Sequence, residues 1–306
     1  MSALVLTAPA EAQGFFDTLA PGSDLPTGEE CAQQVTGLSR IEQRPSNAGL
    51  NQTIGGPTVN IDGADPIYNA AFRQRISGDF AGTTEQILRW GACKWGFNEG
   101  TLRARAWVES SWLMTTAGDI TDDIDTCAFI GQVPPCAQSH GLLQVKAGVH
   151  LGTYPRSTES TAWGVDYALA WTRACFEGSF VWLGPDYGPG DERGCLGAWF
   201  SGEWYDAAAL AYLDVLDARL VERPWYKTDI GDVNCDNQVN IIDALFVVQF
   251  DVLVRTGVAG CPLASPAGNL NQLAGDVNRD LRVNIIDALI IAQCDAFLPN
   301  IFCPNP

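Results

Sequence analysis

The sequence predicts a mainly α-helical protein with two domains, on three observations. Its 306 residues exceed the usual length of one domain. Apolar residues recur at helical spacing from about residue 68 to residue 221, whereas alternating strand patterns are few. The last part of the chain repeats itself, with GDVNCDNQVNIIDALFVVQ followed forty-four residues later by GDVNRDLRVNIIDALIIAQ. We therefore expect a larger helical domain followed by a small all-α one.

The chain divides into five predicted segments. The first ends at Ala10-Glu11-Ala12, which follows a short apolar run and has the small residues of an export-signal cleavage site. The second is rich in Gly, Pro, Asn and Asp and lacks periodicity. The segments are a truncated export signal or tail (1–12), an irregular arm (13–66), a helical domain (67–222), a linker (223–229) and the repeat-bearing domain (230–306).

Charge and composition exclude several classes of function. The formal net charge is −18, and 27 of the 36 acidic residues precede residue 229. Nucleic-acid binding is not expected, because phosphate recognition needs a basic face. The same argument disfavours an anionic polymer or membrane surface as partner. No apolar run reaches the roughly 18 residues that span a bilayer, so we expect no membrane insertion.

The ten cysteines form two even sets, six before residue 200 and four after residue 230. Even sets in each domain indicate disulfides and an oxidising compartment. Zinc is the weaker interpretation, because the chain has no C-x-x-C pair and only two histidines. Cys127 with Cys136, and Cys175 with Cys195, would close short loops and leave Cys31 for Cys93. Six cysteines allow fifteen pairings, so this assignment stays one of several.

Local signals predict where the helices begin. Thr83 and Gln86 fit a capping box, and Asn98 can cap the helix that follows it. Further helices are expected over 161–177 and 203–221. Residues 115–160 between them are rich in turn residues, and we expect loops there.

One helix carries an acid on its apolar side. Residues 102–113 read LRARAWVESSWL, and as a helix they place Leu102, Ala106, Glu109 and Leu113 on one stripe. A buried carboxyl loses hydration in its charged form, so the pKa of Glu109 should rise. A carboxyl still protonated near neutral pH can act as a general acid. Alternatively, Glu109 is a surface carboxylate or is paired with Arg105 one turn earlier.

The repeated segment has the spacing of a calcium loop. Oxygen-bearing side chains fall at loop positions one, three, five, nine and twelve of each copy, and position seven would donate a backbone carbonyl. The predicted Ca²⁺ ligands are Asp232, Asn234, Asp236, Gln238, Asn240 and Asp243 in the first loop, and Asp276, Asn278, Asp280, Arg282, Asn284 and Asp287 in the second. Two acidic N-caps before apolar helices would explain the Asp residues but not the full register.

Each loop leads into one apolar helix, and this pairing resembles a type I dockerin over residues 230–306. The resemblance implies calcium binding and a cohesin-type partner. It places the binding surface at loop positions ten and eleven, here Ile241, Ile242, Ile285 and Ile286. These apolar pairs would either contact the partner or form the module's own core. Loop position six departs from the pattern in the second copy, where Leu281 tolerates a positive φ less well than Asn237 does.

Three motifs of the first domain resemble the lysozyme-like superfamily, especially lytic transglycosylases and goose-type lysozymes. They are the helix end E-S-x-W at Glu109, S-x-G-L-x-Q-V from Ser139, and an aromatic-Ser-Gly turn at 199–202. The resemblance covers about residues 68–221 and implies that Glu109 protonates the glycosidic oxygen, with Ser139 and Gln144 lining the cleft. The last motif departs from the family pattern, because it has Trp199-Phe200-Ser201-Gly202 where the family has a Tyr-Asn turn.

Further site residues are expected around Glu109. An inverting hydrolase needs a second carboxylate roughly 6.5–9.5 Å from the acid. Asp122 and Asp123 are the preferred choices in the acidic run that follows Glu109, with a solvated turn as the alternative for each. Trp112 and Trp199 are expected either to stack on sugar rings or to fill the core.

These observations together predict a secreted or cell-surface enzyme that cleaves β-1,4-linked polysaccharide. Metalloprotease, nucleophile-elbow and phosphate-loop motifs are missing from the sequence. The acidic composition favours a neutral β-1,4-glucan as substrate, and the layout resembles dockerin-bearing lysozyme-fold endoglucanases of cellulosomes. Alternatives are a peptidoglycan lytic transglycosylase or lysozyme, and a non-catalytic wall-binding protein.

Overall fold

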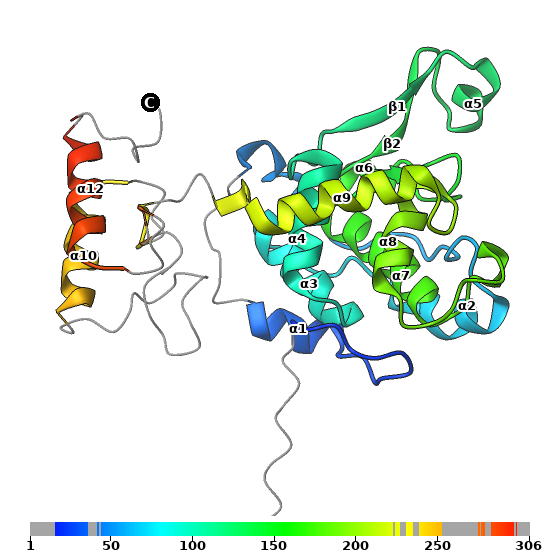
Figure 1. Cartoon of the computed structure of the whole chain (residues 1–306). Coiled ribbons are helices and arrows are strands. Elements are labelled where there is room, and N and C mark those ends of the chain that lie inside the picture. Colours follow the sequence, from blue (N-terminus) through cyan, green and yellow to red (C-terminus); the bar gives the residue numbers. More distant parts are fainter. Residues whose placement is uncertain are drawn as a thin grey trace, which may run out of the picture.

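The computed structural model describes residues 16–35, 42, 44–222, 224–226, 231–234, 239–252, 275, 277–278, 283–296 and 298. The predicted export signal at 1–12 lies outside these residues. The described chain is mainly helical, as predicted (Figure 1). Its α-helices are α1 (Gly28–Val35), α2 (Pro66–Phe72), α3 (Thr84–Trp95), α4 (Glu99–Ser110), α5 (Ile124–Phe129), α6 (Arg156–Glu159), α7 (Thr161–Phe176), α8 (Glu192–Ser201), α9 (Ala207–Glu222), α10 (Ile241–Asp251) and α12 (Ile285–Asp295).

Helix α7 is the centre of the larger domain. All of its residues are buried, including Trp163, Tyr167 and Trp171, which is the pattern of a helix surrounded on every side. Helices α3 and α8 pack against it, and α9 packs on α8 and α4 (Figure 1). The helix that carries Glu109 is thereby held between α3 and α9.

The predicted helix starts are confirmed. Thr83 and Gln86 form the capping box of α3. The Asn98 side chain accepts hydrogen bonds from the backbone N–H groups of Gly100 and Thr101 at the start of α4. Such caps satisfy amide groups that have no partner within the helix, and each stabilises it by about 1 kcal/mol.

The three proposed disulfides of the larger domain are all present. Cys31–Cys93 joins α1 to α3, Cys127–Cys136 closes the loop that contains α5, and Cys175–Cys195 joins α7 to α8. In the C-terminal region, Cys294 is also disulfide-bonded. The expectation of a disulfide-rich protein is therefore confirmed.

Two segments expected to be irregular contain regular elements. The described part of 13–66 is largely irregular, as expected, but it includes α1, which packs on α3, and short 3₁₀ turns at Pro45–Asn47 and Leu50–Gln52. Residues 115–160 contain a three-stranded antiparallel sheet in the order β1 (Ala117–Thr121), β2 (Cys136–His140), β3 (Val145–Lys146). The strands are too short for alternation to stand out, and their partners fix them instead.

The predicted linker is also partly structured. Pro224–Tyr226 forms a 3₁₀ turn, and Trp225 is 2% exposed. Its ring stacks on that of Trp112, with 6.2 Å between the ring centroids. The larger domain therefore extends at least to Tyr226, because Trp225 belongs to its core.

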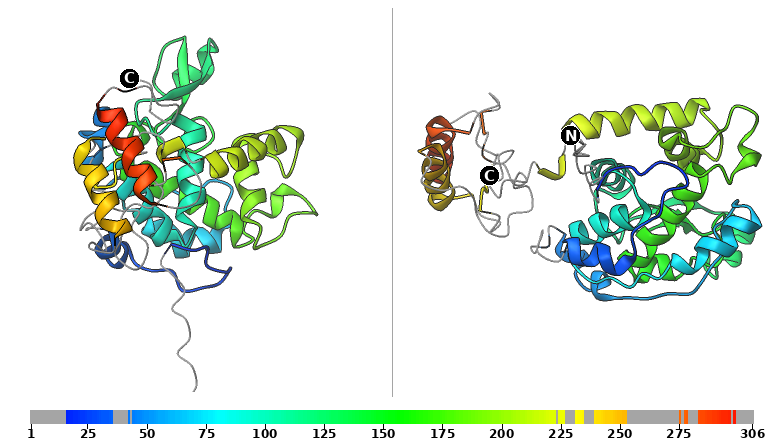
Figure 2. Two further views of the ribbon diagram at one scale, coloured as in Figure 1. Left: turned by 60° about the vertical axis from the view of Figure 1, so that its left-hand side comes forward. Right: turned by 90° about the horizontal axis from the view of Figure 1, so that it is seen from below.

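The C-terminal region contains the two matched helices α10 and α12, which lie side by side (Figures 1 and 2). The Ile241 N–H donates to the Asp295 carboxylate, and the Ile285 N–H donates to the Asp251 carboxylate, both at 3.0 Å. The start of each helix thus meets the end of the other. The helices are antiparallel and related by an approximate two-fold axis.

Candidate functional site

Helix α4 ends directly after Glu109. Its last helical residue is Ser110, and Ser111 and Trp112 follow with positive φ angles of 52° and 64°. The prediction of a helix to residue 113 was therefore wrong, and Leu113 is 37% exposed instead of lying on the buried stripe. Leu102 and Ala106 are buried as predicted.

The carboxyl group of Glu109 is partly buried and hydrogen-bonded. The Tyr212 hydroxyl, from α9, donates to Glu109 Oε1 at 2.7 Å. Burial raises the pKa of Glu109 to about 7, while the Arg105 charge and the Tyr212 hydrogen bond lower it and the Asp119 charge raises it slightly further. A large fraction of the molecules therefore hold the proton at neutral pH, which suits a general acid.

Arg105 does not give Glu109 the low pKa of a paired carboxylate. Its guanidinium donates to Thr172 Oγ1 at 2.8 Å and lies over the Trp199 ring, 4.7 Å from the ring centroid. Its charge lowers the pKa of Glu109, but burial has the larger effect. Of the two sequence-based interpretations, the structure therefore favours the raised pKa over the paired surface carboxylate.

The segment 139–145 lies directly beside the end of α4. Ser110 Oγ donates to the Leu142 carbonyl at 2.8 Å, which joins the two segments. Gln144 Nε2 donates to the carbonyls of Gly141 and Thr116 at 2.8 and 3.2 Å. Gln144 therefore lies close to the end of α4 that carries Glu109. Its side-chain amide is hydrogen-bonded to backbone carbonyl groups there.

Ser139 binds the carboxylate of Asp119, a residue that was not among the predicted site residues. Its hydroxyl donates to Asp119 Oδ2 at 2.7 Å, and Lys146 Nζ lies 3.1 Å from the same oxygen. Burial raises the pKa of Asp119, but the bonds to Ser139 and Lys146 outweigh it and hold the pKa below its usual value. Asp119 is therefore ionised at neutral pH, and its charge acts on Glu109.

Asp122 and Asp123 lie farther along the hairpin than Asp119. They connect β1 to α5 at the outer end of the β1–β2 arm, which projects from the domain (Figure 1). Both are exposed, and Asp123 accepts a hydrogen bond from the Thr126 N–H as the N-cap of α5. Of this acidic run, the residue with an electrostatic effect on Glu109 is Asp119, so the structure does not support the choice of Asp122 or Asp123.

Backbone strain is concentrated around Glu109. Five non-glycine residues of the described chain have positive φ, and four of them are Ser111, Trp112, Asp119 and Gln144. Such conformations cost of order 1–3 kcal/mol each and persist where the surroundings enforce them, often at functional sites. The residue types at these positions give no sign of this clustering in the sequence.

The tryptophans selected from the sequence are mainly structural. Trp112 is 0% exposed, and its indole N–H donates to the Arg103 carbonyl, so a sugar ring cannot reach its face. Trp199 is partly buried and stacks on His150, with 4.7 Å between centroids. The aromatic ring that is open to solvent near Glu109 is Phe200, 55% exposed and stacked on Tyr212 at 4.7 Å.

The C-terminal loops have the donors of a hard-cation site. Asp232 and Asp243 are 2% and 0% exposed, and burial, reinforced by the Asp232 charge, raises the pKa of Asp243 to about 6. Two buried carboxylates in one loop repel each other unless a cation lies between them, so this loop fits Ca²⁺. The predicted ligands Asp236, Gln238, Asp276, Asp280 and Arg282 lie outside the described residues.

Position twelve is built identically in both loops. Asp243 accepts backbone N–H groups of Val233, Asn234 and Asn240, and Asp287 accepts those of Val277, Asn278 and Asn284. Asn240 and Asn284 at position nine direct their side-chain oxygens to the N–H groups of Ile242 and Ile286 as helix N-caps. These bonds fold each loop around its last carboxylate.

Other members of the repeat also match in position. A Cβ at Gly231 would approach Val239 Cγ1 to 2.6 Å, and one at Gly275 would approach Val283 Cγ1 to 2.9 Å, although only Gly231 of the two has a positive φ. Val233, Val247, Val277 and Ile291 share one small core. Ile241, Ile242, Ile285 and Ile286 are all exposed, so they form an outer apolar surface and not the core of the module.

This arrangement defines a paired calcium-loop-helix module. Residues 230–294 match the family model of the dockerin type I domain, a calcium-binding class. No match to the chain is found among curated proteins. None is found among solved structures. The lysozyme-like assignment of the larger domain therefore remains a prediction.

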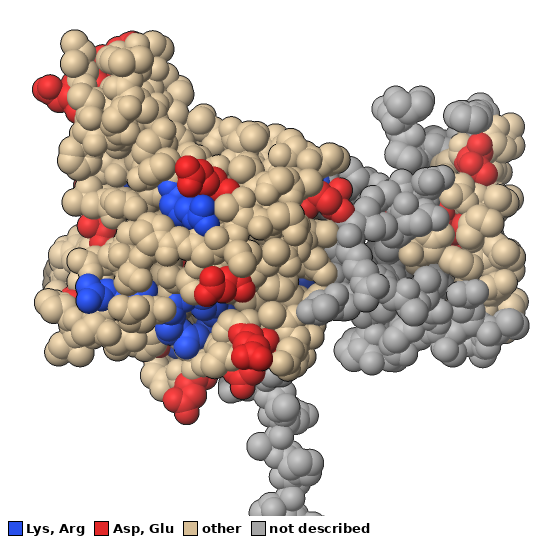
Figure 3. Space-filling view, turned by 180° about the vertical axis from the view of Figure 1, so that it is seen from behind, with Lys and Arg blue, Asp and Glu red and all other residues tan. Residues whose placement is uncertain are grey.

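The described helices include none that is both long and apolar enough to cross a membrane. On the face of the molecule seen in Figure 3, acidic and basic side chains of the described residues lie close together, without a broad basic area.

Proposed function

We propose that this chain is a secreted enzyme that cleaves a β-1,4-linked polysaccharide by acid catalysis from Glu109, and that its dockerin attaches it to a cohesin-type scaffold protein. One observation carries the catalytic part: a partly buried carboxyl with a pKa of about 7, held by a tyrosine hydroxyl. Carboxyl groups whose pKa is shifted in this way cluster at functional sites.

In the proposed reaction Glu109 gives its proton to the glycosidic oxygen. The bond between that oxygen and the anomeric carbon breaks, and its electron pair stays on the oxygen. Tyr212 holds the carboxyl in one orientation through its 2.7 Å hydrogen bond. General acid catalysis of this kind contributes about 10²- to 10⁴-fold to the rate.

Asp119 is the proposed second carboxylate. It is ionised at neutral pH and fixed by Ser139 and Lys146, which suits a base that activates water or a charge that stabilises an oxocarbenium ion. It replaces Asp122 and Asp123 in this role. In a lytic transglycosylase the substrate's own hydroxyl would attack, and Asp119 would then act only as a charge.

A neutral β-1,4-glucan is the proposed substrate, with peptidoglycan as the alternative. The net charge of −18 disfavours an anionic chain. The exposed ring of Phe200, stacked on Tyr212, offers a flat apolar surface to the C–H face of a sugar ring. Neutral glucans present such faces along their whole length.

The test is product release by Glu109→Gln. We expect at least about 100-fold less product than from the native chain, whereas Glu203→Gln, at an exposed glutamate of the same domain, should retain full activity. Native activity should fall as pH rises through about 7, because Glu109 then loses its proton. Equal product from Glu109→Gln and native protein would leave only a wall-binding role.

Mass spectrometry of the products identifies the reaction. The native chain is incubated separately with soluble β-glucan, chitin and peptidoglycan. A new reducing end indicates hydrolysis, and a 1,6-anhydro product indicates transglycosylation. The substrate that yields products assigns the class.

The attachment is tested on a panel of cohesin domains. Binding should require Ca²⁺ and should weaken when Ile241 and Ile285 are both changed to Asp, because these exposed residues lie on the proposed contact surface. Val221→Asp, at an exposed apolar residue of α9, is the matched control.

A further inference from the structure

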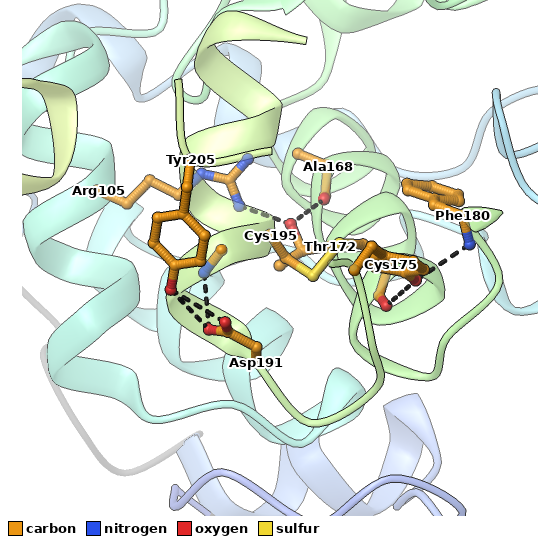
Figure 4. The surroundings of a disulfide bond; sticks show 10 residues. Arg105, Ala168, Thr172, Cys175, Phe180, Asp191, Cys195 and Tyr205 are labelled. Atoms are coloured by element: carbon orange, nitrogen blue, oxygen red, sulfur yellow. Dashed lines mark hydrogen bonds between the residues drawn. A yellow bond between two sulfur atoms is a disulfide. The ribbon is translucent and has the colours of Figure 1, made fainter. Parts of the chain in front are cut away.

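Arg105 is a buried cation placed one helical turn before Glu109. Its side chain is 1% exposed. Figure 4 shows the guanidinium reaching from α4 to the Thr172 hydroxyl on α7, which in turn donates to the Ala168 carbonyl. Burial lowers the pKa of Arg105. The ordinary pKa of a guanidinium is so high, however, that the group keeps its charge at neutral pH.

No carboxylate neutralises this cation in a tight ion pair within the described chain. Among the described residues, Arg105 Nε and Nη2 are buried without a hydrogen-bond partner. The side chain is instead fixed by a hydroxyl and by the face of Trp199. Arg103, two residues earlier, differs: it forms ion pairs with Glu85 and Glu99 at 2.7 and 3.2 Å.

The groups that interact electrostatically with Arg105 come from three helices. They are the Tyr212 hydroxyl on α9, Glu109 on α4 and Glu192 on α8. The hydroxyl is uncharged at neutral pH, because burial raises the pKa of Tyr212 well above its ordinary value. Burial raises the pKa of both Glu109 and Glu192, so one buried cation is shared by two carboxyl groups that resist ionisation. The position of Arg105 does not depend on either, because Thr172 and Trp199 hold it.

We propose that Arg105 is the positioning residue of the Glu109 acid: a fixed cation that stabilises the carboxylate left on Glu109 after its proton has passed to the glycosidic oxygen. This inference rests on the proposed function. Arg105 neither gives nor takes a proton. Its contribution grows as negative charge develops on Glu109, which is when stabilisation accelerates a reaction.

The other groups that face Glu109 set the direction of each expected change. Tyr212 on α9 lowers the pKa of Glu109 together with Arg105, and Asp119 on β1 raises it. Removing the Arg105 charge should therefore raise the pKa of Glu109.

The experiment is a carbon-13 NMR titration of the Glu109 carboxyl in the full-length chain. In Arg105→Met we expect the midpoint to rise by about one pH unit from the native value near 7. Arg105→Lys, which keeps the charge, should restore most of the difference. Arg193→Met, at an exposed ion pair with Asp217, is the control and should leave the midpoint unchanged.

An unchanged midpoint in folded Arg105→Met overturns the proposal. If that variant does not fold, Arg105→Gln decides, because its amide is uncharged but can still donate to Thr172: a higher midpoint supports the role of Arg105, and an unchanged one overturns it. The titration needs no substrate, so its outcome is separate from that of the Glu109→Gln activity test. A catalytically inactive chain could still show the shift, and an active one could lack it.

Discussion

The two candidate sites of this chain are built in opposite ways. Each predicted calcium loop is continuous in sequence, and its last carboxylate accepts hydrogen bonds from backbone N–H groups at most ten residues away. The Glu109 site joins four distant segments, with Tyr212 contributing from 103 residues along the chain. Local spacing therefore determines the first kind of site, whereas the second depends on how the whole domain packs.

Removal of calcium should produce the largest difference in stability between the two regions. With a chelator, α10 and α12 should lose their helical structure, because the buried Asp232 and Asp243 are then left without a counter-charge. The larger domain, whose fold relies on packing and disulfides, should keep its melting temperature. Circular dichroism and calorimetry of the same sample measure both. Unchanged helicity in chelator would contradict the calcium assignment.

The next largest effect should be confined to the larger domain. Asp166, 0% exposed, accepts hydrogen bonds from Lys94 Nζ and Trp95 Nε1, both at 2.6 Å. Lys94→Met leaves this carboxylate buried without its counter-charge and should lower the free energy of unfolding by about 3–5 kcal/mol. Chemical denaturation measures it. Arg219→Met, at an exposed pair with Glu222, should cost at most about 1 kcal/mol.

The equivalence of the two loops can be tested next. Asp243→Asn and Asp287→Asn each remove a buried charge from position twelve, where the hydrogen bonds are the same. Each should weaken the affinity for Ca²⁺ by about 10- to 100-fold, because ligand charge sets affinity in such loops. Calorimetric titration measures both. A loss in one variant alone would show that only one loop binds the ion.

The smallest expected effect is at the helix ends of the module. Asp251→Asn and Asp295→Asn each remove a negative charge from the start of the opposite helix. Each should lower the free energy of unfolding of the calcium-loaded module by about 0.5 kcal/mol. The double variant should show the sum, since the two ends are a helix length apart. Unequal losses would argue against the two-fold arrangement.

This contrast explains what could be predicted from the sequence. The repeat, the caps at Thr83 and Asn98 and the raised pKa of Glu109 depend on local spacing, and the structure has them as expected. The two short-range disulfide pairings, Cys127–Cys136 and Cys175–Cys195, were also correct, and they left Cys31 to pair with Cys93, 62 residues away. Each of these features involves residues whose neighbours along the chain already limit the possibilities.

The partners of Glu109 could not be predicted in the same way. Tyr212 lies in an ordinary amphipathic helix, and only the packing of α9 on α4 brings it to Glu109. Asp119 was passed over because the segment was expected to be a loop, and the register of β1 on β2 places it beside Ser139. Whether Trp112 stacks on a sugar ring or fills the core could not be decided from the sequence, because the ring that covers it, Trp225, comes more than a hundred residues later.

The end of α4 at Ser110 has one more consequence. Peptide dipoles in a helix add up, so the last turn carries a partial negative charge of about half an electron. Glu109 lies in that turn, and its ionised form faces this backbone field. No side-chain substitution can remove the field while the helix persists. The raised pKa of Glu109 is therefore partly a consequence of its position at the C-terminal end of the helix. Any carboxyl group at position 109 would have the same contribution to its pKa.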